Sequence, residues 1–161
     1  MSKHQKETDI RFMRRALQLA KRGYGKVSPN PMVGAVLVSH HEIIGEGWHR
    51  KAGGPHAEVI AIRDAEKKGN TTHLSKLYVS LEPCYKLEQC CAKRIASSGI
   101  NNVIISSLDP NPIINNKGID FLKKNKIKVF LEKKKFDQFK NINKYFFNFH
   151  KKSRPYITLK L

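Results

Sequence analysis

Two short stretches, Pro55-His56-Ala57-Glu58 and Leu81-Glu82-Pro83-Cys84, decide how the rest of this 161-residue sequence is interpreted. The first follows two glycines and opens a segment with helical periodicity, and the second ends a segment with the composition of a buried strand. A neutral imidazole and thiolates are the ligands that zinc prefers, and a catalytic zinc keeps its fourth position open for water. We therefore expect His56 and Cys84 to bind one zinc ion, with the remaining chain as a scaffold and pocket around it.

A third ligand is expected from the pair Cys90-Cys91, of which only one residue is needed. Cys91 lies four residues before Ile95, on the inward side of a predicted short helix. Cys90 shares a side of that helix with Arg94 and Ser97, which indicates a wetter position. We favour Cys91, and Cys90 stays the alternative. Thiolates at a helix N-terminus are stabilised by the helix dipole, and a metal ion neutralises them.

A glutamate two positions after His56 completes a known pattern. The order H-x-E…P-C…C is typical of zinc deaminases, in which the glutamate is not a ligand but moves protons. We predict that Glu58 takes a proton from the attacking water, gives it to a ring nitrogen and then protonates the departing amine. Alone, His56 would more often be structural and Glu58 solvated, and only their combination with Pro83-Cys84 and a further cysteine reverses that expectation. His49 fits a substrate contact and an ordinary loop histidine equally well.

The hydrophobic pattern around these stretches alternates between strand and helix periods. Predicted strands cover 33–38, 43–48, 77–81, 103–107, 127–131 and 156–161. Predicted helices cover a first segment capped by Thr8 or Asp9 and closed near Gly23, then 56–68, 91–98, 118–125 and 136–150. The first two strands are expected to pair as a hairpin through His40-His41-Glu42. Strands that alternate with helices predict an α/β fold built on a layered sheet.

Length and composition agree with one domain that is long enough to bury a core. Hydrophobic residues make up 40% of the chain, and no apolar run approaches the roughly 18 residues of a membrane span. Residues 1–7 are polar and lack the apolar core of a signal peptide. Three cysteines, two of them adjacent, make a poor disulfide framework and fit a metal in a reducing compartment better. We therefore expect a cytoplasmic protein without a membrane partner.

The formal net charge of +18 would attract phosphate, either in a nucleic acid or on a small substrate. From Lys117 to Leu161 the chain has fourteen Lys or Arg against three acids, and Asn, Ile and Phe are also frequent there. We interpret most of these lysines as solvated residues of a compositionally biased chain. Aromatic and basic residues do not interleave in a recognisable RNA-binding motif, so we do not expect nucleic acid as a partner.

Further motifs occur in order along nearly the whole chain: Asn30-Pro31-x-Val33-Gly34, Gly45-Glu-Gly-Trp-His49, Ala52-Gly53, His56-Ala-Glu58, Leu81-Glu-Pro-Cys84, Asp109-Pro-Asn-Pro112 and Gly118-Ile119. In this order they resemble the deaminase domain of the bifunctional riboflavin biosynthesis proteins, in which a pyrimidine deaminase is joined to a reductase. The His-Ala-Glu and Pro-Cys pieces alone indicate only the wider deaminase superfamily. The Asn-Pro, Asp-Pro-Asn-Pro and C-terminal matches select this family.

The resemblance implies a three-layer α/β/α fold like that of cytidine deaminase, with a central mixed sheet of about five strands. It implies a zinc-dependent hydrolysis in which 2,5-diamino-6-(5-phosphoribosylamino)pyrimidin-4-one loses its 2-amino group as ammonia and becomes 5-amino-6-(5-phosphoribosylamino)uracil. Cys91 is the preferred third match because of its distance from Gly99. By resemblance, the site then consists of the Zn²⁺ ligands His56, Cys84 and Cys91, the proton shuttle Glu58, and the substrate-pocket residues Asn30 and His49.

Two departures from the family pattern affect substrate and partners. The family usually has a longer loop between its zinc cysteines, with Ser-His, Gly, a basic residue and Thr-Pro-Pro, whereas this chain has only Tyr85-Lys-Leu-Glu-Gln-Cys90. Lys86 is our candidate phosphate contact in that shorter loop. Arg154 to Leu161 resembles the opening strand of the reductase, so we divide the chain into a deaminase domain, 1–150, and a tail, 151–161. We expect the reductase on a separate polypeptide, and the protein to be a homo-oligomer.

Two alternative functions remain at this point. A deaminase of tRNA adenosine or another nucleobase would draw support from the net charge, but it predicts a short Pro-Cys-x-x-Cys spacing that this chain lacks. A degenerate deaminase fold that docks onto a separate reductase would draw support from the altered loop, and it would lose zinc on purification.

Overall fold

The computed structural model describes residues 3–85, 90–132 and 136–152, which fold around one five-stranded sheet. In pairing order, its strands are β2 (Glu42–Trp48), β1 (Gly34–Ser39), β3 (Lys76–Val79), β4 (Asn102–Ile105) and β5 (Lys128–Leu131). β1 pairs antiparallel with both β2 and β3, whereas β3, β4 and β5 run parallel. The sheet is therefore mixed, and the predicted hairpin between the first two strands is confirmed.

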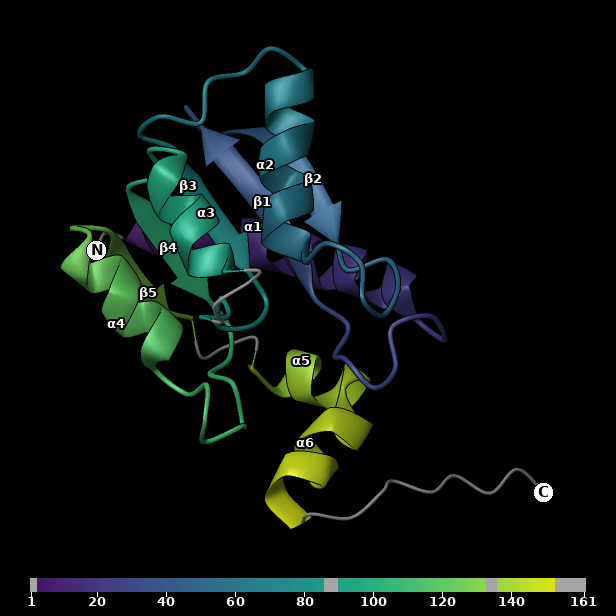
Figure 1. The fold of residues 1–161 in the computed structure, drawn as a ribbon. Helices are drawn as coiled ribbons and strands as arrows, with labels where there is room; N and C mark the ends of the chain where they lie inside the picture. The colour runs from purple at the N-terminus through teal and green to yellow at the C-terminus, as the bar shows by residue number, and fades with distance from the viewer. Residues whose placement is uncertain (1–2, 86–89, 133–135, 153–161) are drawn as a thin grey trace.

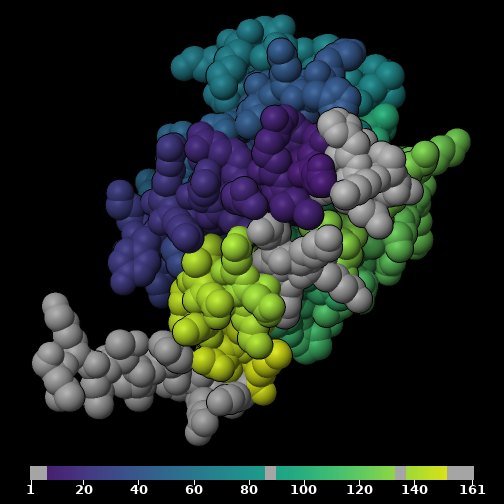
Figure 2. All heavy atoms as spheres, turned by 180° about the vertical axis from the view of Figure 1, so that it is seen from behind, coloured from purple at the N-terminus to yellow at the C-terminus, as the bar shows by residue number. Residues whose placement is uncertain are grey.

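Helices cover both faces of this sheet. α1 (Lys3–Ala20) lies across one face and continues into the short 3-10 helix η1 (Lys21–Gly23). α2 (Ala57–Lys67), α3 (Cys91–Ser97) and α4 (Lys117–Lys124) follow one another on the opposite face (Figure 1). In the view turned by 180°, the purple N-terminal segment that contains α1 lies on the face toward the viewer (Figure 2). The predicted three-layer α/β/α architecture is confirmed.

Glycines let α2 lie directly on β2. A Cβ added at Gly47 would stand 2.3 Å from the carbonyl oxygen of Ala57, and one added at Gly45 would stand 2.3 Å from that of Ala61. Real Cβ atoms do not approach backbone so closely, so any side chain there would push the helix away from the sheet. The N-terminal end of α2 is thereby held against the end of β2, next to the stretch that begins with His56.

The predicted cap of the first helix is wrong. α1 already begins at Lys3, so Thr8 and Asp9 lie inside the helix. Asp9 is buried, and its carboxylate accepts a hydrogen bond of 2.6 Å from the hydroxyl of Tyr78 on β3. The side chain that local sequence marks as a cap therefore joins α1 to the centre of the sheet.

The predicted helix over 136–150 is two helices, α5 (Phe136–Ile142) and α6 (Lys144–Lys152). They meet at Asn143, whose side chain bonds to the backbone of Met32, a contact that hydrophobic period cannot reveal. Both lie near the edge of the sheet where β3 and β4 end (Figure 1). The predicted strand 156–161 lies outside the described residues, as does most of the tail, so the division at residue 150 stays a prediction. Within the described ranges, no helix is long and apolar enough to cross a membrane.

Candidate active site

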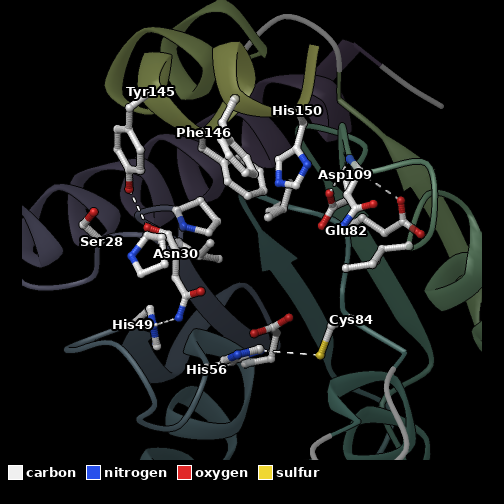
Figure 3. A pocket seen from close by; sticks show the side chains of 18 residues that line it. Ser28, Asn30, His49, His56, Glu82, Cys84, Asp109, Tyr145, Phe146 and His150 are labelled. Carbon is white, nitrogen blue, oxygen red and sulfur yellow. Dashed lines mark hydrogen bonds between the residues drawn. The ribbon is translucent and has the colours of Figure 1, made fainter. Parts of the chain in front are cut away.

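The functional site lies at one edge of the sheet. β2, β3 and β4 end there and β1 begins there, because β1 runs antiparallel to its two neighbours. Ligands of open α/β sheets bind at such an edge, outside the carboxyl ends of the strands. Here the edge surrounds a cavity of about 540 Å³. It is lined by the loop before β1, the start of α2, the loops after β3 and β4, and one side of α6 (Figure 3).

Three potential metal ligands converge on one side of this cavity, which we call the floor. His56 occupies the N-cap position of α2, Cys84 lies beyond the end of β3, and Cys91 is the first residue of α3. One ligand atom from each falls within 4.8 Å of the others. Nδ1 of His56 lies 3.2 Å from Sγ of Cys91 and 3.5 Å from Sγ of Cys84. The structure thus brings together the three residues predicted as ligands.

This geometry fits a tetrahedral zinc site. With Zn–N near 2.1 Å and Zn–S near 2.3 Å, a tetrahedral angle separates nitrogen from sulfur by about 3.6 Å, close to the two separations seen here. One imidazole and two thiolates would balance the charge of Zn²⁺ and leave the fourth position open. Among the described residues the group offers three ligands, the number that proteins usually supply in catalytic zinc sites, whereas closed structural sites have four.

Cys90 does not join this group. It is the N-cap of α3, and its sulfur accepts a hydrogen bond of 3.4 Å from the backbone N–H of Lys93. Its thiol also lies 3.7 Å from the carbonyl oxygen of Cys84. The side chain of Cys90 therefore serves the start of the helix, while that of Cys91 turns toward His56.

The two thiols of the floor influence each other strongly. A hydrogen bond from the Cys91 thiol, supported by His56, lowers the pKa of Cys84 to about 4, against the effect of burial. The same pairing with Cys84, together with burial, raises the pKa of Cys91. One thiolate therefore forms readily here and the second requires a compensating positive charge, which is what a bound divalent cation supplies.

Glu58 lies in the first turn of α2 and also lines the cavity. Its side chain is buried, and burial raises the pKa of its carboxyl to about 7, with His56 opposing that shift. Oε2 of Glu58 has no hydrogen-bond partner in the described part of the chain. A carboxyl of this kind can both accept and return a proton near neutral pH.

His49 and Asn30 form the adjoining wall of the cavity. Nδ1 of His49 lies 3.1 Å from the carbonyl oxygen of Pro55, which can only accept, so this nitrogen carries the proton. Nε2 then accepts from the side-chain amide of Asn30 at 3.3 Å. Burial lowers the pKa of His49, which agrees with a neutral ring. With its NH₂ turned toward His49, Asn30 directs its oxygen toward the cavity (Figure 3).

Comparison with known proteins agrees with this geometry. Residues 6–107 match the family model of the cytidine and deoxycytidylate deaminase zinc-binding region. The chain belongs to this deaminase family. Its cofactor is zinc, and the grouped histidine and cysteines of the floor are the residues available to hold it.

Individual relatives narrow the similarity to riboflavin biosynthesis. The diaminohydroxyphosphoribosylamino-pyrimidine deaminase of Buchnera aphidicola subsp. Schizaphis graminum is 48% identical over 121 residues, which cover 73% of this chain and 80% of that protein. The riboflavin biosynthesis protein RibD of Aquifex aeolicus is 41% identical over 157 residues, 96% of this chain but only 43% of that protein. The predicted resemblance to this group is confirmed.

A solved structure agrees in fold. The diaminohydroxyphosphoribosylaminopyrimidine deaminase/5-amino-6-(5-phosphoribosylamino)uracil reductase of Thermotoga maritima superposes with a TM-score of 0.89 at 40% identity. The match covers 95% of this chain and 44% of that one. This chain therefore spans less than half the length of both the Aquifex and the Thermotoga proteins.

The side of the deaminase cavity opposite the floor, which we call the roof, was missed by sequence reasoning. It is formed by four residues of α6: Tyr145, Phe146, Phe149 and His150. His150 has no neighbour in sequence that marks it as a site residue, yet it is half-buried and lines the cavity. In contrast, His40, His41 and His73 are exposed. The only signal for the roof was an aromatic helical period, which is equally typical of a core helix.

The wall beyond Cys84 contains two buried acids, Glu82 and Asp109. Oε2 of Glu82 accepts a hydrogen bond of 3.3 Å from the backbone N–H of Asp109. Asp109 in turn accepts from the backbone N–H of Asn111 at 2.8 Å, which shapes the turn after β4. Both acids belong to the motifs that carried the resemblance, although neither was assigned a role. Lys86, our candidate phosphate contact, lies outside the described residues.

Proposed function

We propose that this protein is a zinc-dependent deaminase of riboflavin biosynthesis. It converts 2,5-diamino-6-(5-phosphoribosylamino)pyrimidin-4-one and water into 5-amino-6-(5-phosphoribosylamino)uracil and ammonia. The observation that carries the proposal is the convergence of His56, Cys84 and Cys91 within 4.8 Å, in a cavity that the buried carboxyl of Glu58 also lines. The named activity of the Buchnera relative, 48% identical, supports the choice of substrate.

In this proposal His56, Cys84 and Cys91 hold the zinc ion. Bound zinc supplies Lewis acidity, which makes a water molecule acidic enough to serve as a nucleophile near neutral pH. The N-termini of α2 and α3 favour negative charge close to the thiolates. Close packing of α2 on Gly47 fixes the position of its N-cap residue, His56, so the site is assembled before substrate enters.

Glu58 moves the protons. As the water oxygen bonds to the carbon that bears the 2-amino group, the Glu58 carboxylate takes a proton and passes it to the neighbouring ring nitrogen. A second transfer protonates the departing amine, the C–N bond breaks, and ammonia leaves while the carbonyl forms. The raised pKa of Glu58 suits a group that must be both base and acid in one turnover.

Asn30 and His49 orient the pyrimidine. The neutral ring of His49, fixed by Pro55, holds the amide of Asn30 so that its oxygen can accept a hydrogen bond from the substrate. The cavity volume of about 540 Å³ lies within the range of small-molecule sites and leaves room for a ribosyl phosphate.

The alternatives have less support. A tRNA adenosine deaminase predicts the Pro-Cys-x-x-Cys spacing, whereas the sulfurs near His56 belong to Cys84 and Cys91. A degenerate fold without zinc does not predict three well-spaced ligands beside a buried carboxyl. We further propose that the enzyme is a cytoplasmic homo-oligomer, and that its product passes to a reductase on a separate polypeptide. Free thiols at all three cysteines suit a reducing compartment.

The test is ammonia release by purified, zinc-loaded protein supplied with the diaminopyrimidine phosphate. We expect Glu58→Gln to lower kcat about 100- to 10,000-fold while zinc content stays unchanged. Glu66→Gln is the matched control, because Glu66 lies on the same helix but is paired at the surface with Arg94. Activity that survives Glu58→Gln would sink the mechanism, and activity on dCMP but not on this substrate would sink the substrate assignment.

A further inference from the structure

Glu82 carries a buried carboxyl group that the proposed mechanism does not use. It lies between the end of β3 and the zinc ligand Cys84, and it is only 2% exposed. Burying a carboxylate costs free energy unless hydrogen-bond donors and dipoles surround it. The groups around Glu82 therefore indicate what its carboxylate holds in place.

Backbone N–H groups of two other segments surround this carboxylate. Its Oε2 accepts a hydrogen bond of 3.3 Å from the N–H of Asp109, in the loop after β4 (Figure 3). Burial raises the pKa of Glu82, and the N–H groups of Asn116, Asp109 and Ile119 oppose that shift. Asn116 and Ile119 belong to the start of α4. The carboxylate therefore interacts with both the loop after β4 and the N-terminus of α4.

The N-terminus of α4 takes its negative charge from outside the helix. The side chain of its N-cap residue, Asn116, bonds to Asn115 and gives no capping hydrogen bond to the helix. Oε1 of Glu82 makes no hydrogen bond with the described residues, so it interacts with this helix end through charge and dipole. A helix N-terminus favours an anion at such a position.

Gly118 brings the same helix end onto the segment that carries the zinc ligand. A Cβ added at Gly118 would stand 1.9 Å from the carbonyl oxygen of Pro83 and 3.7 Å from Oε1 of Glu82. The backbone of α4 therefore lies directly on Pro83. The carbonyl oxygen of Cys84 also accepts a hydrogen bond of 3.2 Å from the N–H of Ala92 in α3. Cys84 is thus held between two helices.

We propose that Glu82 is a positioning residue for the zinc site. Its carboxylate anchors the Pro83-Cys84 segment to the start of α4 and to the loop after β4, so that the Cys84 thiol is in place before zinc binds. A ligand that is already ordered loses less conformational freedom on binding, and outer-shell partners commonly contribute about 10- to 100-fold to metal affinity. This proposal rests on the metal site of the proposed function and not on the identity of the substrate.

The test measures the zinc affinity of the folded protein by competition with a chromophoric chelator. Glu82→Gln keeps the size of the side chain and removes its negative charge, and we expect the zinc dissociation constant to rise about 10- to 100-fold. Asp64→Asn is the matched control, because Asp64 also accepts a backbone N–H, that of Glu46 at 2.9 Å, but does not line the cavity. Its zinc affinity should be that of the unaltered protein. An unaltered zinc affinity in Glu82→Gln would overturn the proposal, even if that variant is less stable.

Gly118→Ala tests the same contact from the opposite element, because the added methyl group would push α4 away from Pro83. We expect weaker zinc binding again, and we expect Glu82→Gln/Gly118→Ala to lose less than the product of the two single losses, because both changes release one segment. Gly69→Ala is the control for instability: its φ of +75° strains any side chain, but an added Cβ meets nothing within 4 Å. A loss of zinc affinity in Gly69→Ala equal to that in Glu82→Gln would mean that general instability explains the effect, and the positioning role would fall.

A spectroscopic measurement shows whether Cys84 itself has moved. Co²⁺ accepts the ligands of tetrahedral zinc sites, and its absorption bands report the bound thiolates. At saturating Co²⁺ we expect weaker thiolate absorption in Glu82→Gln and an unaltered spectrum in Asp64→Asn. An unaltered spectrum in Glu82→Gln would mean that Cys84 keeps its place without Glu82, against the proposal. If the protein fails to deaminate the diaminopyrimidine phosphate while Glu82→Gln weakens zinc binding, the positioning role stands and the assigned reaction falls.

Discussion

The floor and the roof of the cavity are built in different ways. The floor is made of side chains fixed by the ends of secondary structure elements: the N-cap of α2, the first residue of α3, and the loop after β3. The roof is one side of α6, which reaches the site from the end of the described chain. The comparison teaches that the residues of the floor are marked by short local motifs, whereas the shape of the pocket depends on long-range packing.

The contact that joins roof to wall illustrates this dependence. Asn143 is fully buried, and its Oδ1 accepts from the backbone N–H of Met32 at 2.7 Å. Its Nδ2 donates to the carbonyl oxygens of Met32 at 3.0 Å and Phe139 at 3.3 Å. Residues 111 positions apart in the sequence are thereby held together, two residues from Asn30. The side-chain amide of Asn143 thus fixes the position of the start of α6 and of the loop that carries Asn30, a predicted substrate contact.

The largest effect should come from the floor. Replacing Cys91 by Ser removes one thiolate, and we expect zinc affinity to fall more than about 100-fold, since loss of even an outer-shell partner commonly costs 10- to 100-fold. Deaminase activity should fall with it. Zinc content after dialysis against a chelator, measured by atomic absorption, checks the expectation.

Cys90→Ser is the matched control for that change. Ser is a good N-cap residue, so the start of α3 should be preserved, and zinc content should remain that of the unaltered protein. Loss of zinc from Cys90→Ser together with its retention in Cys91→Ser would reverse the assignment of the third ligand and contradict the geometry of the floor.

Much of the floor could be predicted because metal chemistry restricts residue types and spacing. His56, Glu58 and Cys84 stand at fixed offsets within two motifs. Cys91 could be preferred over Cys90 as the third ligand because its spacing to Ile95 places it on the inward side of the predicted short helix. Sheet and layers were also predictable, because the strand and helix periods alternate along the chain. These signals are local, and the structure places the five described strands within a few residues of the predicted bounds, whereas the first helix begins earlier and the helix predicted over 136–150 is divided.

The roof could not be predicted because its determinants are not local. The helical period predicted one helix over residues 136–150. It could not predict the interruption at Asn143, because that residue bonds to Met32 in the loop before β1. The same period marks Phe146 as core, and it does not distinguish a core from the side of a cavity. His150 has no ligand-like neighbour in sequence, and only the position of α6 shows that it lines the cavity.

An intermediate effect is expected where wall and roof are joined. Asn143→Ala leaves the backbone N–H and C=O of Met32 without their side-chain partner, and unfolding free energy should fall by about 2–4 kcal/mol. The loop with Asn30 should also lose its fixed position, raising KM more than it lowers kcat. Urea denaturation of the zinc-loaded protein gives the first quantity and initial rates give the second.

Asn148→Ala is the comparison for this variant, because Asn148 lies on α6, the helix that Asn143 precedes, and does not line the cavity. Its stability should change by less than about 0.5 kcal/mol, as is usual for substitutions away from buried networks. If the two variants are equally stable, the long-range contact does not hold the roof, and the contrast drawn between local floor and long-range roof fails at that point.

The smallest effect should come from Tyr145, whose hydroxyl donates a hydrogen bond to the backbone carbonyl oxygen of Asn30. Burial raises the pKa of Tyr145, so the hydroxyl stays protonated and able to donate. Tyr145→Phe keeps the ring in the roof and removes only this bond, which should cost about 0.5–1.5 kcal/mol of stability and raise KM about 2- to 5-fold. Tyr24→Phe, at a site that is 80% exposed, should change neither quantity.

The hydroxyl of Tyr145 bonds to the backbone carbonyl oxygen of Asn30 and not to the side-chain amide that faces His49. The pairing of Asn30 with His49 should therefore survive in Tyr145→Phe, and kcat should stay within about 2-fold. A large fall in kcat would instead mean that α6 positions the reacting groups themselves, and the separation between a chemical floor and a shape-giving roof would have to be abandoned.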